Sequence, residues 1–198
     1  MRIIAGSAKG KTLLSPPDAR TRPTSDRARE GLFSSLESEF GSINDLAFLD
    51  LFAGSGADGV EALSRGATLV HAVESNSEMS RIASANFELV KSPVGKFKVI
   101  HSSAKKYLDN EFTFHQAPES GFDIIFMDPP YELPNSDITD LLLSIVRGNL
   151  LKHYGIIAIE RETKSKPFEW PEGMEEIKVR SYGQGSIYYG GYSASVLP

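Results

Sequence analysis

The stretch FLDLFAGSGADGVEALSRG, residues 48–66, joins an apolar run to a helical pattern through a loop that holds three glycines. Gly54, Gly56 and Gly59 fit the spacing GxGxxG, and glycine allows the tight turn and the close backbone approach that such a loop needs. The apolar run before the loop and the helical spacing after it predict a strand followed by a helix, which is the first half of a βαβ unit.

The same alternation of apolar strands and helical patterns continues along the chain. Strands are predicted at residues 48–52, 69–73, 97–100, 123–127 and 156–159. Helices are predicted between them, at residues 60–64, 78–90, 104–108 and 138–151. Strands separated by helices form right-handed crossovers, so we expect an α/β fold with a doubly wound, mostly parallel sheet. The C-terminal EEIKVRSYGQGSIYYGGYSA, residues 175–194, is expected to add an antiparallel hairpin at one sheet edge.

Length and composition set the broad class of the protein. The chain has 198 residues, about one ordinary domain, with 40% hydrophobic and 24% charged residues. It contains no cysteine, which excludes disulfides and cysteine-based zinc sites. The opening MRIIAGSAKGKTLL lacks the apolar core of a signal peptide, and no run is long enough to span a membrane. We therefore expect a cytoplasmic protein with no membrane partner.

The N-terminal region differs in charge from the rest of the chain. Residues 1–36 hold seven basic and three acidic side chains, a net of +4, whereas the whole chain carries −5. Such a basic block is typical of a surface that meets a polyanion. Within it the sequence predicts a hairpin with its turn at residues 7–10, followed by a helix that Thr24 or Ser25 can cap.

A second signal follows the glycine loop. Glu74 closes the next predicted strand 20 residues after Gly54. An acid at that position accepts hydrogen bonds from ribose hydroxyls, so the loop and the acid together predict a nucleoside site. Asp50 and Asp58 place negative charge beside the loop, which disfavours the pyrophosphate of a dinucleotide. The same charge suits the amine and sulfonium of S-adenosylmethionine.

The stretch FDIIFMDPPYELP, residues 122–134, ends a predicted strand on Asp128 and two prolines. Proline lacks an N–H and fixes its own φ, so we expect a stiff turn whose carbonyl oxygens have no ladder partner. Together with the Asp128 carboxylate these oxygens would accept the N–H groups of an exocyclic amine, and the Tyr131 ring would stack on a planar base. Such contacts would orient the amine for in-line attack on a methyl group, with positioning and electrostatics supplying the catalysis and no metal required.

Several of these motifs occur together in a known family. DLFAGSG, VES and DPPY resemble motifs of the class I S-adenosylmethionine-dependent methyltransferases that modify amino nitrogens. RPTSDRAREGLFSSL and EALSRGA are similar to the RsmD family, which methylates the N2 of a guanine in 16S rRNA. The resemblance implies a seven-stranded Rossmann-like methyltransferase domain at residues 43–198 and a small RNA-binding extension of hairpin and helix at residues 1–42. It also implies S-adenosylhomocysteine as product and the small ribosomal subunit or its assembly intermediate as substrate. We expect a monomer.

The resemblance assigns roles to individual residues. Cofactor contacts are implied for Asp50, Phe52, Ala53, Gly54, Gly56, Glu74, Ser75, Ser103, Ala104 and Asp128. The catalytic turn is implied to be Asp128, Pro129, Pro130 and Tyr131, and phosphate contacts are expected from Arg20, Arg22, Arg27 and Arg29. The chain departs from the family pattern at two positions. Ser103 stands where the family commonly has Asp or Asn for the adenine amino group, and Asp58 stands where the family has an apolar residue.

Other functions share part of this pattern. DNA adenine-N6 methyltransferases also carry DPPY, but they normally add a target-recognition domain for which 198 residues leave no room. A protein-glutamine methyltransferase would usually have Asn in place of Asp128. A non-enzymatic rRNA-binding assembly factor is disfavoured by the intact turn, and a nicotinamide-dependent oxidoreductase by Asp50. His71, His101, His115 and His153 show no helical pairing and are expected to be surface or core residues.

Overall fold

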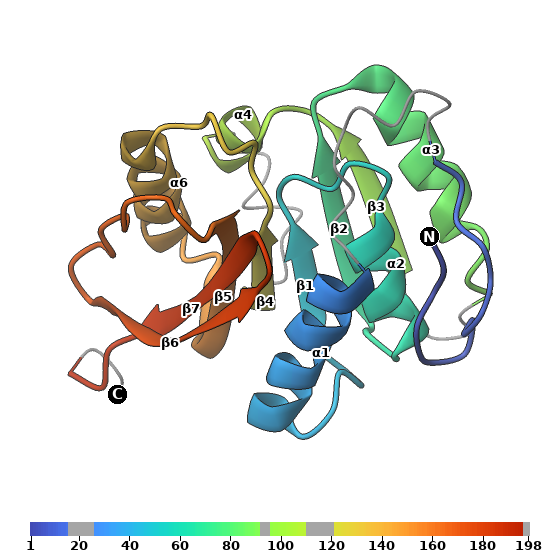
Figure 1. Ribbon diagram of the computed structural model, residues 1–198, viewed down its shortest axis with the longest axis horizontal. Helices are drawn as coiled ribbons and strands as arrows, with labels where there is room; N and C mark the ends of the chain where they lie inside the picture. The colour runs from blue at the N-terminus through green and yellow to red at the C-terminus, as the bar shows by residue number, and fades with distance from the viewer. Residues whose placement is uncertain (16–25, 92–95, 110–120, 196–198) are drawn as a thin grey trace.

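The computed structural model describes residues 1–15, 26–91, 96–109 and 121–195. These residues build one seven-stranded sheet flanked by helices (Figure 1). The strands are β1 (Ala47–Asp50), β2 (Leu69–Glu74), β3 (Lys96–His101), β4 (Phe122–Met127), β5 (Leu151–Glu162), β6 (Met174–Tyr182) and β7 (Gly185–Tyr192). The helices are α1 (Asp26–Phe40), α2 (Ala57–Ser64), α3 (Ser77–Phe87), α4 (Ala104–Leu108) and α6 (Asn135–Arg147). Every strand and helix predicted from the sequence is present.

The order of strands across the sheet is β3-β2-β1-β4-β5-β7-β6. The first five strands pair in parallel, and β7 pairs antiparallel with both β5 and β6. This confirms the predicted doubly wound sheet with a C-terminal antiparallel hairpin. From β1 the chain builds outward through β2 and β3, and then returns to place β4 on the other side of β1. Strand order therefore reverses between β1 and β4, which is where such sheets bind ligands.

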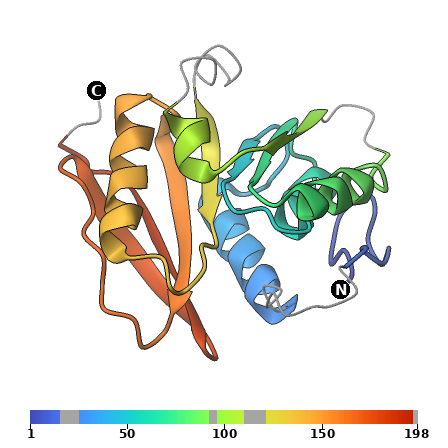
Figure 2. The ribbon, with the colours of Figure 1, turned by 90° about the horizontal axis from the view of Figure 1, so that it is seen from above.

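Two apolar layers cover the sheet, because the parallel strands are buried on both faces. On one face α1, α2 and α3 pack through residues such as Phe33, Val60 and Phe87. On the other face α4 and α6 pack through residues such as Leu108 and Leu142. Figure 2 shows α1 and α6 on opposite sides of the sheet. Among the helices of the described ranges, none has the length and apolarity needed to cross a membrane.

The predicted boundary between the last helix and the fifth strand was wrong. The apolar spacing predicted a helix through residue 151, but α6 ends at Arg147 and Leu151 already begins β5. Between them Asn149 takes a positive φ of 49°. Asparagine tolerates this left-handed conformation, which stops a helix, so the apolar residues that follow belong to the strand.

The predicted N-terminal hairpin is confirmed. The Ile3 amide donates to the Lys11 carbonyl at 3.0 Å, and the Leu13 amide donates to the Met1 carbonyl at 3.1 Å. Gly10 closes the turn by donating to the Ile3 carbonyl at 2.8 Å. The proposed helix caps, Thr24 and Ser25, lie outside the described residues.

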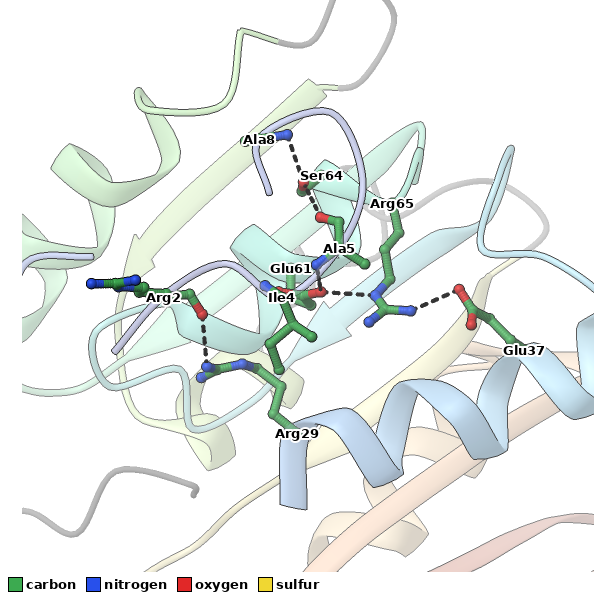
Figure 3. Close-up of polar contacts among 9 residues, drawn as sticks. All are labelled: Arg2, Ile4, Ala5, Ala8, Arg29, Glu37, Glu61, Ser64 and Arg65. Carbon is green, nitrogen blue, oxygen red and sulfur yellow. Dashed lines mark hydrogen bonds and ion pairs between the residues drawn. The ribbon is translucent and has the colours of Figure 1, made fainter. Parts of the chain in front are cut away.

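Buried polar groups of α2 hold this hairpin in place (Figure 3). The Glu61 carboxylate, which is fully buried, accepts from the amides of Ile4 at 2.7 Å and Ala5 at 2.9 Å. The Ser64 hydroxyl donates to the Ala5 carbonyl at 2.6 Å and accepts from the Ala8 amide at 3.0 Å. The hairpin is thereby fixed to the helix that follows the glycine loop.

Candidate active site

The candidate site lies where the carboxyl ends of β1, β2 and β4 meet at one edge of the sheet. Asp50 ends β1, Glu74 ends β2 and Asp128 directly follows β4. Asp50 pairs in register with Phe126 of β4 and with Ala72 of β2. The structure thus brings together, at the reversal of strand order, three acids that the sequence singled out.

The glycine loop has the conformation that its sequence predicts. Gly54 and Gly56 take positive φ values of 53° and 77°, a region that glycine enters without steric cost. At Gly56 a Cβ atom would also lie 3.0 Å from the Ala83 Cβ and 3.1 Å from the Phe87 ring. At Gly59 it would lie 2.7 Å from the same ring. These glycines therefore turn the loop and let α2 pack closely on α3.

Glu74 ties the glycine loop to the start of the next helix. One carboxylate oxygen accepts from the Gly54 amide at 2.8 Å, and the other accepts from the Asn76 amide at 2.6 Å. Asn76 in turn caps α3 by accepting from the amides of Glu78 and Met79. Each carboxylate oxygen can accept two hydrogen bonds, so Glu74 retains capacity for the hydroxyls of a ribose.

Two buried carboxyl groups face the loop. Asp50 is 1% exposed and accepts only a long bond of 3.4 Å from the Phe52 amide, and its Oδ2 has no hydrogen-bond partner within the described ranges. Burial, together with the charge of Asp58, raises the pKa of Asp50 well above its ordinary value. Burial likewise raises the pKa of Asp58 to about 7, although the charge of Arg29 opposes this shift. Burying two adjacent acids is costly, and a cationic ligand would relieve that cost.

Arg29 requires a correction to the predicted phosphate contacts. Its side chain is fully buried, and its Nη2 donates to the Arg2 carbonyl at 3.0 Å and to the Asp26 carboxylate at 2.6 Å. A guanidinium held inside the protein cannot reach a phosphate, so Arg29 is a structural residue. Arg27 is exposed on α1, and its phosphate contact stays a prediction. Arg20 and Arg22 lie outside the described residues.

The turn after β4 also differs from the prediction. The carbonyl oxygens of the turn were expected to lack a ladder partner and to be able to point into the cleft; those of Pro130 and Tyr131 instead accept from Arg161 of β5, at 3.2 Å and 3.3 Å. The Pro130 carbonyl also accepts from the Leu133 amide at 2.9 Å. At these two residues a buried cation on a neighbouring strand supplies the donors that the ladder lacks. The half-buried Asp128 carboxylate remains a candidate acceptor for a target amine.

Comparison with known proteins places the chain in a family. The family model described as "Conserved hypothetical protein 95" matches residues 1–190. The chain belongs to this family, which is the RsmD family. It is 38% identical over 182 residues to the ribosomal RNA small subunit methyltransferase D of Escherichia coli, covering 89% of this chain and 84% of that protein. It is 32% identical over 188 residues to the putative rRNA methyltransferase YlbH of Bacillus subtilis, covering 92% and 94%.

A solved structure agrees with this assignment. The putative methyltransferase yhhF from Escherichia coli superposes with a TM-score of 0.78 and 26% identity, covering 98% of both chains. The predicted RsmD membership and the predicted Rossmann-like methyltransferase fold are thus confirmed.

Ser103, one of the two departures from the RsmD pattern, has a structural role. Its hydroxyl caps α4 by accepting from the Lys106 amide at 3.2 Å. It follows β3 at the same sheet edge as Glu74, whose carbonyl accepts from the Ser102 amide at 3.0 Å. Ala104 is buried at the start of α4. Contacts of Ser103 and Ala104 with an adenine remain predictions.

The remaining candidates lie around the loop or in the core. Phe52 and Ala53 lead into the glycine loop, and Ser75 follows Glu74 at the surface. His71 is buried beside the Tyr107 hydroxyl at 3.1 Å, and burial lowers its pKa to about 4, as expected for a neutral core residue. His115 lies outside the described residues.

Arg161 is a functional candidate that the sequence analysis missed, because it lies in none of the quoted RsmD motifs. It is 4% exposed at the carboxyl end of β5, next to the strand that leads into the turn. The available signal was an arginine two residues after the apolar run GIIAI, residues 155–159, at the sheet edge that holds the site. Its hydrogen-bond partners depend on tertiary structure and could not be predicted from spacing.

Proposed function

We propose that the protein transfers a methyl group from S-adenosylmethionine to the exocyclic N2 of a guanine in 16S rRNA, acting as a monomer on the small ribosomal subunit or its assembly intermediate. The observation that carries this proposal is the placement of the buried acids Asp50 and Asp58 at the same sheet edge as the turn that follows Asp128. The names of the relatives, which specify ribosomal RNA of the small subunit, support the substrate class.

The residues present fit the methyl donor. The carboxylates of Asp50 and Asp58 would hold the methionine amine and balance the sulfonium charge, and Glu74 would accept from the ribose hydroxyls. The positive φ values of Gly54 and Gly56 let the backbone approach the ligand closely. S-adenosylmethionine, when bound, supplies a methyl group on a positively charged sulfur.

The turn after β4 would prepare the acceptor nitrogen. Asp128 accepts an N–H bond from the guanine amine and fixes its direction, while the Tyr131 ring stacks on the base. Positioning of this kind supplies much of the catalysis, because a conjugated amine is a weak nucleophile until its lone pair is directed at the methyl carbon. A new N–C bond forms as the S–C bond breaks, and the proton leaves the methylated nitrogen to Asp128 or to water.

The basic extension would hold the RNA. We propose residues 1–42 as the RNA-facing part and residues 43–198 as the methyltransferase domain. Arg20, Arg22 and Arg27 are the candidate phosphate contacts. The hydrogen bonds of Glu61 and Ser64 fix the hairpin to α2, so RNA bound there would be held close to the glycine loop.

The decisive experiment is transfer of label from methyl-labelled S-adenosylmethionine to small ribosomal subunits that lack native methylation, followed by nucleoside analysis. We expect labelled N2-methylguanosine. Duplex DNA assayed in parallel tests the adenine-N6 alternative, which would give labelled N6-methyladenine instead. Binding to the subunit without any label transfer would favour the non-enzymatic assembly factor.

A further inference from the structure

We propose that Arg161 is a positioning residue that sets the shape of the target-binding turn at residues 128–131. The proposal rests on the proposed function for the identity of the target, but the contacts that motivate it belong to the protein alone. Arg161 lies on β5, and the turn it holds follows β4, the neighbouring parallel strand.

The guanidinium gathers several acceptors from one short segment. Its Nη1 donates to the Pro130 carbonyl at 3.2 Å, and its Nη2 donates to the carbonyls of Tyr131 at 3.3 Å and Leu133 at 2.8 Å. A planar guanidinium presents its donors in a fixed fork, which lets one side chain define the directions of several carbonyl groups. Carbonyl directions fix the peptide planes, and these decide where the Tyr131 ring lies.

The same side chain connects the turn to two further elements. Its Nη2 also contacts the Asn135 side-chain oxygen at 3.5 Å, at the start of α6. The Asn135 side-chain nitrogen donates to the carbonyls of Lys166 at 2.9 Å and Pro167 at 3.1 Å, in the loop after β5. The turn, the first turn of α6 and this loop are therefore held around one buried cation.

The charge of this cation acts on the proposed catalytic group. Burial lowers the pKa of Arg161, and the charges of Tyr131, Tyr188 and Asp128 oppose that shift. Asp128 is thus within electrostatic reach of the guanidinium. The turn itself has few backbone donors, because Pro129 and Pro130 lack an N–H. Arg161, on the neighbouring strand, donates the hydrogen bonds that the carbonyls of Pro130 and Tyr131 accept.

The hydroxyl end of the Tyr131 ring lies beside β7. A Cβ at Gly185 would lie 2.7 Å from a Glu160 carboxylate oxygen and 3.5 Å from the Tyr131 hydroxyl. The hydroxyl therefore lies close to the Gly185 backbone. A shift of the turn carbonyls would move the ring, and a displacement of about 1 Å can cost about 10²-fold in rate.

The test compares Arg161→Gln and Arg161→Lys with a matched control, Arg147→Gln, which changes an exposed arginine at the end of α6. Three quantities are measured for each: the single-turnover rate of methyl transfer at saturating small subunits, the cofactor Kd, and hydrogen exchange of the Leu133 amide. For Arg161→Gln we expect a rate about 10²-fold lower, with the cofactor Kd changed less than about threefold.

The exchange measurement separates positioning from simple stability. The Leu133 amide donates to the Pro130 carbonyl, which Arg161 also holds, so its exchange should become faster in Arg161→Gln. Lysine keeps the charge without the fork, so Arg161→Lys should recover part of the rate and part of the protection. The control variant should match the wild-type protein in all three quantities.

Other outcomes would overturn the proposal. A wild-type rate in Arg161→Gln would show that the turn keeps its shape without the guanidinium. An equal loss of cofactor binding and rate in both variants would assign Arg161 to general stability. If Arg161→Gln does not fold, Arg161→Lys decides the question. If the wild-type protein methylates no ribosomal particle, the proposed function fails, whereas exchange of the Leu133 amide still tests the contact.

Discussion

Asp58 is a residue whose protonation depends on pH near neutrality. Its buried carboxyl has a pKa raised from 3.8 to about 7, so it is largely protonated in the free protein at pH 6. In the proposed site the cationic cofactor binds the ionised form of Asp58, so binding below pH 7 releases a proton. We expect cofactor affinity to rise with pH up to about 7, by at most about tenfold per pH unit, and to level off above it. Calorimetry between pH 5 and pH 8 would measure the effect, and Asp58→Asn should reduce it by the share of Asp58.

The same residue predicts the pH dependence of stability without cofactor. Because the pKa is higher in the folded protein than in the unfolded chain, the folded state binds more protons between pH 3.8 and about 7. The contribution of Asp58 to the free energy of unfolding is therefore greatest below this window and is lost as pH rises through it. Urea titrations of Asp58→Asn should show a flatter profile, whereas an unchanged profile would contradict the shifted pKa.

At the scale of elements, substitutions in the turn after β4 should distinguish cofactor binding from methyl transfer. Asp128→Ala should leave cofactor affinity within about tenfold but remove most turnover, because the partner proposed for Asp128 is the target amine. Tyr131→Phe should be mild and Tyr131→Ala severe, since stacking needs the ring and not the hydroxyl. Steady-state kinetics with small subunits would measure both. Wild-type turnover in Tyr131→Ala would contradict the stacking role.

A second element, α2, carries the N-terminal hairpin through Glu61. Glu61→Ala leaves the amides of Ile4 and Ala5 without their acceptor, at a cost of about 1–3 kcal/mol for each group left buried. We expect a loss of this order in the free energy of unfolding, measured by urea titration. The matched control is Glu37→Gln, at the more exposed end of an ion pair with Arg65, and it should cost about 0–1 kcal/mol. Equal losses in the two variants would argue against the anchoring role of Glu61.

Glu61 and Arg161 show the limit of what residue spacing in the sequence can predict. Apolar periodicity located the strands and helices of the described ranges, apart from the end of α6, and glycine spacing located the loop, because both depend on local backbone geometry. The hairpin partners of Glu61 lie 56 and 57 residues away, and the partners of Arg161 lie 26 to 31 residues away. Arg29 was misassigned for a related reason, since charge alone does not show whether a guanidinium is covered by other elements.

At the scale of the whole molecule, the uneven charge distribution predicts how particle binding responds to salt. Each arginine that meets a phosphate should, when changed to Ala, reduce the slope of log affinity against log salt by about 0.7–0.9. We expect this for Arg27→Ala, Arg20→Ala and Arg22→Ala, with cofactor binding unchanged. Arg29→Ala serves as the contrast, because loss of a buried guanidinium should lower stability and leave the slope unchanged. Unchanged slopes in all of the first three variants would place the RNA contacts elsewhere.

The position of β7 has a consequence for how the protein is made. This strand lies between β5 and β6, and it contributes Ile187 and Tyr189 to the apolar layer that also contains α1. A nascent chain that has not yet reached Gly185 therefore carries β5 with one edge unpaired, and unpaired edges invite pairing with other chains. Synthesis must pass β7 before the sheet can close. Pauses in synthesis after β5 should therefore be the point at which this protein aggregates or needs a chaperone.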